Sequence, residues 1–305
     1  MVSCRRPSLY LWTLPLRSVE RLRRDEMMAT NSSWARPEGR FLGVEKRMGT
    51  VDQRCMHLNK EDLATLKKIQ GDLGILADLS RADVLLYCAC EGDRAVVVSQ
   101  ARPHSILPIY AESLVEHQIS LADAPALLRS LGEGRRGFTE ARRPIGKHLA
   151  QDRMATIVQE TFPVQGQDGR VMAAVSIETN LIEQERHRRR SKVFRQAMRQ
   201  FREMVLAGRL RGAERLTPVQ EQDGLLIVDA QHDIGYASDT ATSLYRNLGY
   251  AGGLLKRRVE DLELDDHSLL LDAMEHGRCF EGEVKVGDLV WIKKVIPLLA
   301  PRSRL

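Results

Sequence analysis

The chain has 305 residues, enough for two domains that each bury a core of their own. Hydrophobic residues make up 43% of it and charged residues 29%, and no apolar run approaches the ~20 residues that a membrane-spanning helix needs. The formal net charge of +5 is a small excess spread over the whole length, so it does not argue for a nucleic-acid partner without a local basic patch.

The first 56 residues differ in pattern from the rest. Two early arginines and an apolar stretch at residues 9–16 resemble a secretory leader, but Pro15 interrupts the stretch, basic residues follow it and no small-residue cleavage site comes next. Residues 27–56 contain Pro, Gly, Asn and Ser without sustained periodicity. We therefore expect residues 1–56 to be a poorly ordered N-terminal extension. Our hypothesis is that the natural start lies near Met56, directly before the first well-patterned helix.

Residues 57–180 are expected to fold as an α+β domain around an antiparallel sheet. Asn59 is placed to cap a helix with apolar residues at helical spacing, and Gly92 and Asp93 are typical of the turn of a hairpin. The expected elements are helices at residues 59–80 and 124–131 and strands at residues 82–89, 94–101, 154–165 and 170–179.

Residues 181–218 are expected to be a linker that consists mainly of one long helix, residues 181–210. Apolar side chains recur along it at helical spacing, so this face would dock on either domain or on a second copy of the chain. The residues expected at this interface are Phe194, Met198, Phe201 and Val205.

Residues 219–305 open with two short apolar runs, at residues 225–228 and 234–237, which predict a hairpin followed by a small-residue helix. A second helix is expected to begin after Asp265 or Asp266 as its cap and to end before Gly277, and a closing hairpin follows it. Strand pair, helical middle and strand pair is therefore the expected chain order of this domain.

The cysteines form no Cys-x-x-Cys pair and are odd in number, so we expect reduced thiols rather than a disulfide framework. Cys88 and Cys90 lie two positions apart in an expected strand and would face one side as a small buried pair. A metal-binding or redox use of this pair is the alternative. The five cysteines are Cys4, Cys55, Cys88, Cys90 and Cys279.

Residues 58–299 resemble the sensory half of a soluble two-component histidine kinase. This group has a GAF-like domain, a PAS domain and then a kinase core, and its partners are often RNA-binding antitermination response regulators. The resemblance rests on GDLGILADLSRADVLLY and VVVSQARPHS in the first domain, TFPVQGQDGRVMAAVSIETN before the linker, and DGLLIVDAQHDIGYAS in the second. It implies that the second domain is a PAS domain, with helices on one face of a five-stranded antiparallel sheet, of which only four strands can be counted here.

The departures from this family matter equally. The second PAS strand is usually followed by a Ser-Pro-Asn-Ala run, whereas Ser238, Asp239, Thr240 and Ala241 stand here, which puts two polar contacts of the family in doubt. No His-His-x-x-Lys-Asn-Asn phosphoacceptor run and no glycine-rich ATP-binding box occur in the sequence. Phosphoryl transfer needs a positioned histidine and a Mg-ATP site, so we expect no catalytic residue and a chain truncated before the kinase core.

The resemblance also places the ligand sites. In a GAF-like domain the site lies between the sheet and the helical middle, near the strand ends where Gln100, Arg102 and His104 stand; Arg143 would face the same cavity. Arg102 would hold an anionic group with two hydrogen bonds, or else pair with a local carboxylate while His104 faces solvent. The pocket candidates of the PAS domain, which would otherwise be plain core, are Tyr236, Tyr245, Leu248 and Trp291.

Two other motifs favour ordinary structural roles. GEGRRG, residues 132–137, matches a dinucleotide fingerprint, but a helix precedes it and a proline-containing segment follows, so a surface loop is expected. RHRRR, residues 186–190, would surround a helix instead of forming one stripe, which favours a solvated or intersubunit face over nucleic-acid binding. The histidines show no metal-ligand spacing, so no metal site is expected.

We interpret the chain as the cytoplasmic signal-sensing module of a histidine kinase, which binds a small ligand and transmits through the linker helix. The alternative is a stand-alone ligand-binding or dimerising regulatory protein without a kinase. The expected partners are a second copy of the chain and a small-molecule signal, with a response regulator only through the missing kinase core and with no nucleic acid or membrane. The sequence identifies neither the signal nor any cofactor.

Overall fold

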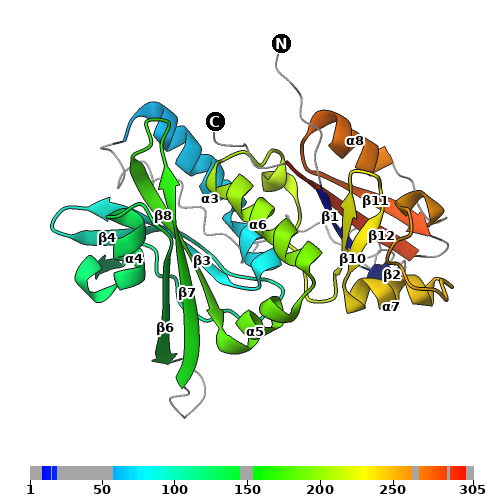
Figure 1. Ribbon diagram of the computed structural model, residues 1–305, viewed down its shortest axis with the longest axis horizontal. Coiled ribbons are helices and arrows are strands. Elements are labelled where there is room, and N and C mark those ends of the chain that lie inside the picture. Colours follow the sequence, from blue (N-terminus) through cyan, green and yellow to red (C-terminus); the bar gives the residue numbers. More distant parts are fainter. Residues whose placement is uncertain are drawn as a thin grey trace, which may run out of the picture. The chain divides into compact units, whose positions relative to one another are not determined.

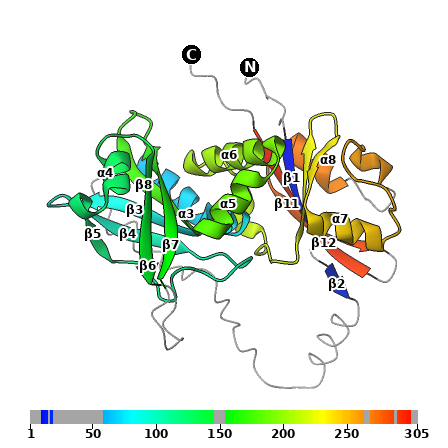
Figure 2. The same ribbon diagram turned by 60° about the horizontal axis from the view of Figure 1, so that its bottom comes forward.

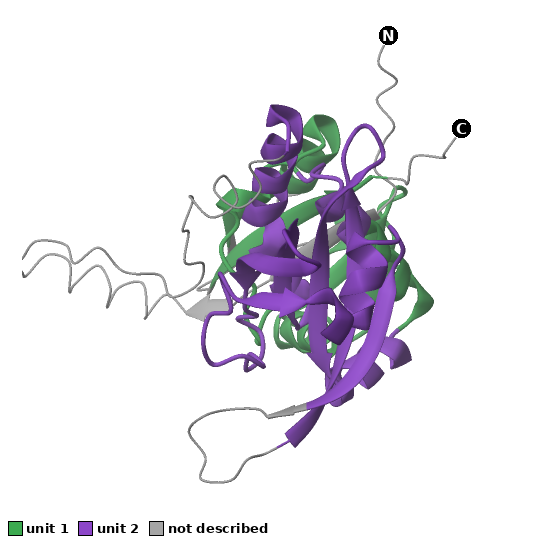
Figure 3. Ribbon diagram, turned by 90° about the vertical axis from the view of Figure 1, so that its left-hand side faces the viewer, with its two compact units in different colours: residues 1–42, 191–200, 211–305 green, residues 43–190, 201–210 purple. Residues whose placement is uncertain are grey.

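A computed structural model of the chain describes residues 9–14, 16–18, 58–144, 154–262, 268–286 and 289–299. The chain divides into two compact units, coloured separately in Figure 3. Unit 2 comprises residues 43–190 and 201–210, and unit 1 comprises residues 1–42, 191–200 and 211–305. No helix among the described residues is long and apolar enough to cross a membrane.

Unit 2 is built on a six-stranded sheet in which all neighbouring strands are antiparallel (Figure 1). Its strands, in the order in which they lie in the sheet, are β5 (Gln118–Ser120), β4 (Arg94–Ala101), β3 (Asp83–Cys90), β8 (Val171–Asn180), β7 (Met154–Gln165) and β6 (Gly137–Pro144). The α+β class and the four predicted strands are confirmed, whereas β5 and β6 were not predicted.

Several helices pack on this sheet. Helix α3 (Lys60–Ser80) begins where the Asn59 side chain accepts a hydrogen bond from the Asp62 amide at 2.8 Å, as predicted, and ends at Arg81, which adopts a left-handed backbone with φ of 51°. The short helices η1 (Leu121–Asp123) and α4 (Pro125–Leu131) cover a cluster of buried side chains on the sheet. That cluster consists of Leu85, Tyr87, Ala95, Val97, Leu121, Ala124, Leu127 and Ala174.

Gly137 is held at the contact between β6 and α4. A Cβ atom there would clash with the carbonyl oxygen of Ala126 and with the Thr161 hydroxyl, which are themselves hydrogen-bonded at 2.6 Å. We expect Gly137→Ala to lower the free energy of unfolding of unit 2 by at least about 2 kcal/mol, because buried backbone must move to admit the methyl group.

Urea denaturation of the full chain measures this effect. Gly71→Ala is the matched control, because Gly71 lies inside α3 with nothing within 4 Å of its Cβ position. That control should raise stability by up to about 1 kcal/mol through helix propensity. Equal effects of the two substitutions would contradict the predicted clash.

The linker does not form the single long helix that was predicted. The structure has α5 (Leu181–Arg189) and α6 (Lys192–Leu206), with Arg190 in an extended conformation between them. The Ser191 hydroxyl accepts a hydrogen bond from the Phe194 amide at 3.2 Å and so starts a new helix. Of the four predicted interface residues, Phe194, Phe201 and Val205 are buried within a single chain and Met198 is half-buried, so dimerisation through this face stays a prediction.

Unit 1 contains a second antiparallel sheet of six strands (Figures 1 and 2). Along the sheet lie β10 (Ile234–Ala237), β9 (Gly224–Asp229), β1 (Leu9–Leu14), β12 (Leu289–Leu298) and β11 (Phe280–Val286), and β2 (Leu16–Ser18) also pairs with β12. The remaining elements are η2 (Ala213–Arg215), α7 (Asp239–Asn247), η3 (Val259–Asp261) and α8 (Ser268–His276). Both predicted hairpins and both predicted helices are present.

The N-terminal segment departs from expectation at two places. Leu9–Leu14 and Leu16–Ser18, predicted to be poorly ordered, are strands of the unit 1 sheet, and β1 lies between β9 and β12. The cause is non-local pairing, which the local sequence pattern does not reveal. The sheet therefore has a central strand that does not come from residues 219–305.

The cysteines also need a correction. Cys88 is disulfide-bonded, whereas Cys90 and Cys279 are free thiols, so the prediction of wholly reduced cysteines is wrong at Cys88. Cys90 is only half-buried, so it does not form the predicted buried pair with Cys88.

Candidate functional site

A buried polar cluster lies on the inner face of the unit 2 sheet. Across β3 and β8, Tyr87 is opposite Ala174, and both side chains belong to the apolar cluster under η1 and α4. Side chains alternate along a strand, so Asp83 and Glu178, which are directly opposite each other four pairs further on, lie on the same face. Asp83 is 1% exposed and Glu178 is 0% exposed.

Glu178 is the hydrogen-bonded centre of this cluster. One of its carboxylate oxygens accepts a short hydrogen bond from the Tyr110 hydroxyl. The other accepts from the Gln159 amide nitrogen at 2.9 Å and from the Ser176 hydroxyl at 3.0 Å. Donors to both oxygens offset the cost of burying this carboxylate and fix its orientation.

Asp83 is only partly satisfied. Its Oδ2 accepts a hydrogen bond from the Ile109 amide at 2.6 Å, but its Oδ1 is buried without a hydrogen-bond partner among the described residues. Burial raises the pKa of Asp83 to about 6, and the Glu178 charge adds to the shift. The backbone hydrogen bonds from Ile109 and Tyr110 and the Arg102 charge oppose it. Burial therefore destabilises the ionised form of the Asp83 carboxyl group. Its Oδ1 can accept a hydrogen bond from a further donor.

Gln100 and Arg102, two of the predicted ligand residues, lie next to Asp83. Gln100 is opposite Leu85 across β3 and β4, so its side chain points to the inner face. Its Oε1 accepts from the Leu114 amide at 2.7 Å, whereas its Nε2 is buried and lacks a partner in the part of the chain that the structure describes. The inner face thus presents an open donor at Gln100 and an open acceptor at Asp83.

The other two predicted residues do not join this group. The backbone amide of His104 donates to the Asp78 carboxylate at 2.7 Å, and its Nδ1 lies 3.0 Å from the same oxygen. His104 therefore fastens the chain after β4 to the end of α3. Arg143 belongs to β6, but its side chain lies outside the described residues.

Sequence reasoning missed Asp83, Glu178 and Tyr110. The sequence did contain a signal for two of them: Asp83 begins one apolar strand and Glu178 lies near the end of another. A buried acidic residue in an apolar strand needs a partner or a function, so both positions could have been predicted as site candidates.

The predicted pocket residues of unit 1 are mostly core. The rings of Tyr245 and Trp291 meet edge to face with centroids 5.6 Å apart, and Leu248 packs against the same buried cluster. Burial raises the pKa of Tyr245 above its ordinary value. Tyr236 is elsewhere, with its ring centroid 5.1 Å from that of Phe194 at the start of α6.

Lys293 is an unpredicted polar residue of this interior. It lies on β12 between Trp291 and Val295, two members of the buried cluster, so alternation places it on the same face. It is 1% exposed, and burial lowers its pKa to about 7. A charged lysine is therefore costly here.

A groove of about 720 Å³ lies at the surface of unit 1, next to α8 and β11. Charges of both signs line it, and several already pair: the Thr217 amide donates to Glu281 at 2.7 Å, and the Arg278 guanidinium lies 4.6 Å from the Phe280 ring centroid. The lining residues are Arg211, Gly212, Glu214, Arg215, Leu216, His276, Arg278, Cys279, Phe280, Glu281, Gly282, Glu283 and Ile292. Glu281 and Arg278 of this groove are thus already engaged, which makes it a weaker ligand site than the inner face of unit 2.

No metal site emerges within the described ranges, where no group of three or more His, Cys, Asp or Glu side chains comes together as metal ligands would. Residues 132–137 follow α4 and lead into β6, so they do not form the strand-to-helix turn that binds pyrophosphate.

Comparison with known proteins gives unit 2 a family likeness. Residues 48–198 match the family model described as "Histidine kinase PdtaS, GAF domain". A solved structure titled "Sensor region of a sensor histidine kinase" is 19% identical, with 78% of this chain and 92% of that chain covered and a TM-score of 0.53, which supports the fold. A Rhodobacter sphaeroides LOV protein shares a partial likeness, with 16% identity, coverage of 50% of this chain and 89% of that chain, and a TM-score of 0.35. No curated protein matches the chain.

Proposed function

We propose that this chain is the signal-sensing part of a histidine kinase and binds a small polar ligand on the inner face of the unit 2 sheet; the match of residues 48–198 to the GAF domain of the histidine kinase PdtaS supports the sensory role. The single observation that supports this site best is the pair of open polar atoms, Asp83 Oδ1 and Gln100 Nε2. Buried polar groups are nearly always hydrogen-bonded, so two such atoms on one face suit a ligand.

The chemistry of the pair defines the ligand class. The ligand donates a hydrogen bond to Asp83 and accepts one from Gln100, as the edge of an amide does. Arg102, whose charge acts on Asp83, supplies a cation at the edge of the site for an anionic substituent. The donors that already hold Glu178 keep the second carboxylate from competing for the ligand.

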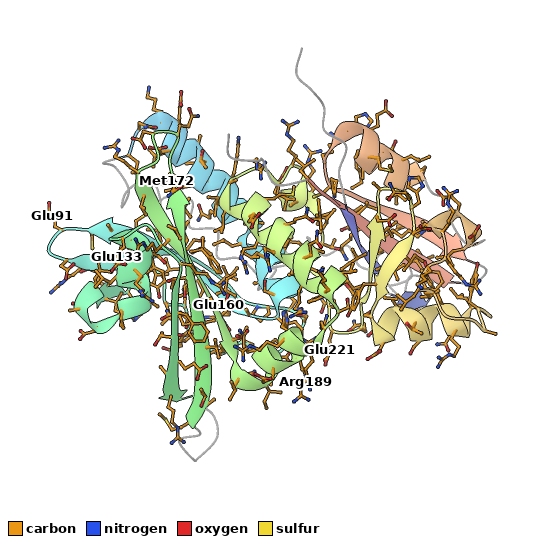
Figure 4. All side chains as sticks on the ribbon, viewed as in Figure 1. Glu91, Glu133, Glu160, Met172, Arg189 and Glu221 are labelled. Atoms are coloured by element: carbon orange, nitrogen blue, oxygen red, sulfur yellow. The ribbon has the colours of Figure 1, made fainter. Side chains whose placement is uncertain are left out.

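The ligand signal would leave this site through α5. Arg81 precedes Asp83 by two positions on one side, and Asn180, which follows Glu178 by two positions, caps α5 on the other. The Arg81 guanidinium donates to Glu183 of α5 at 2.9 Å, and Gln184 of α5 donates to Glu160 of β7, labelled in Figure 4, at 3.3 Å. Ligand binding would shift the population of α5 positions and, in a complete kinase, bias the kinase core that follows.

Native mass spectrometry of the full chain purified from its native cells tests the binding step. We expect a retained small molecule on the unmodified chain and its loss, or at least a tenfold weaker retention, in Gln100→Met. Gln118→Met makes the same chemical change at an exposed position of β5 and should keep the molecule. Equal retention by both variants, or no retained molecule on the unmodified chain, would remove the support for this site.

A further inference from the structure

The position of β1 in the unit 1 sheet is the unexplained feature of the fold. β1 pairs antiparallel with β12 through residues 9–13 and with β9 through residues 9–14 (Figures 1 and 2). Leu11, for example, is opposite Ile296 on one side and Ile227 on the other. β1 is therefore an interior strand, and both of its backbone edges are used.

The strands on either side depend on β1 for much of their pairing. Without it, β9 would pair only with β10, and β12 would pair with β11 and, at Leu289–Trp291 alone, with β2, so two open edges would face each other in the middle of the sheet. An open edge presents a row of unpaired amide and carbonyl groups, which is costly when buried and binds other strands when exposed. β9 and β12 also supply Leu226, Val228, Trp291 and Val295 to the buried cluster, so the core of the unit rests on these strands.

The sequence of β1 suits this place. LYLWTL consists of apolar, aromatic and β-branched residues, which are enriched in strands. The pairing with β9 ends at Leu14, opposite Gly224, whereas the pairing with β12 continues in β2. This accounts for the apolar character of Leu9–Leu14.

We propose that the gap between β9 and β12 is a strand-binding site, that Leu9–Leu14 is its occupant, and that this segment is an integral part of the second domain. Recognition is by main-chain hydrogen bonds on both edges, so the site accepts the same sequence from a separate peptide once its own strand is withdrawn. A chain that began at Met56 would leave the site empty. The proposal is independent of the ligand site in unit 2.

Hydrogen exchange of the full chain is the first test. The backbone amides of residues 9–14 are expected to exchange on the order of 100-fold or more slowly than in an unstructured peptide, with protection similar to that of β9 and β12. Exchange of residues 9–14 at the unstructured rate would overturn the proposal.

Leu11→Pro in the full chain is the second test. It removes an interior amide, so the protection of β9 and β12 should fall at least about tenfold. A synthetic peptide of residues 8–19 should restore that protection, whereas the same peptide carrying Leu11→Pro should not. If the variant keeps full protection of β9 and β12, or if both peptides act alike, the site does not bind this strand; if the variant fails to fold alone, rescue by the unmodified peptide still decides the question.

Discussion

Replacement of Lys293 by methionine is expected to flatten the pH dependence of the free energy of unfolding of unit 1 between pH 7 and pH 10.5, by up to roughly 4 kcal/mol. Burial lowers the pKa of Lys293 from 10.5 to about 7, so the folded protein binds fewer protons than the unfolded chain between these values. The stability of the unmodified protein should therefore increase as the pH rises from 7 towards 10.5. Lys293→Met should lose this increase, because methionine has nothing to titrate.

Lys294 provides the matched control for this prediction. It is the next residue on β12, is also 1% exposed, and its Nζ lies 3.7 Å from Oδ2 of the buried Asp223 carboxylate. Lys294→Met would leave that carboxylate buried without its cation, so we expect a loss of roughly 3–5 kcal/mol. Urea denaturation of both variants at pH 7 and pH 9.5 separates the two effects. A loss of stability in Lys293→Met at pH 7 would show that Lys293 makes a needed interaction.

Local pattern was enough to predict the elements that carry strong periodicity. The four long strands of unit 2 and the hairpins of unit 1 alternate or run apolar between turn residues, and Asn59 and Gly277 mark helix ends. β6 was missed because it lies at the edge of its sheet, where half of its side chains face water and the apolar signal is weak. The break at Arg190 was missed because arginine and lysine are good helix formers and the stop depends on the Ser191 cap.

Local sequence pattern does not predict the pairing of strands that lie far apart in the chain. Leu9–Leu14 was read as part of a poorly ordered extension because no neighbouring segment pairs with it; its partners lie in β9 and β12, far along the chain. The same cause hid the candidate site in unit 2. Gln100 and Arg102 were predicted as polar residues at a strand end, but Asp83 and Glu178 come together only when β3 and β8 pair. The register of this strand pair is set by the whole sheet and cannot be predicted from either strand alone.

Asp83→Asn is expected to raise the free energy of unfolding of unit 2 by about 1–3 kcal/mol at pH 7.5. The pKa of Asp83 is raised from 3.8 to about 6, so the folded protein binds more protons than the unfolded chain between these values. The contribution of Asp83 to stability is therefore greatest below pH 4 and decreases as the pH rises to 6. Asparagine keeps an oxygen for the Ile109 amide at the position of Oδ2, and it carries no charge to bury. Urea denaturation between pH 4 and pH 7.5 should show a flatter pH dependence in the variant.

Glu178→Gln tests whether the two facing carboxylates differ as the hydrogen bonds indicate. Glu178 accepts from Tyr110, Gln159 and Ser176, so an amide nitrogen in place of one oxygen would face donors and leave at least one of them unsatisfied. We expect this variant to lose about 1–3 kcal/mol at pH 7.5, opposite in sign to Asp83→Asn. The contrast follows from one sheet face on which one carboxylate is fully hydrogen-bonded and its neighbour keeps an open oxygen. If both substitutions stabilised unit 2, repulsion between the two carboxylates would explain the raised pKa of Asp83. The open oxygen of Asp83 would then no longer support a ligand contact.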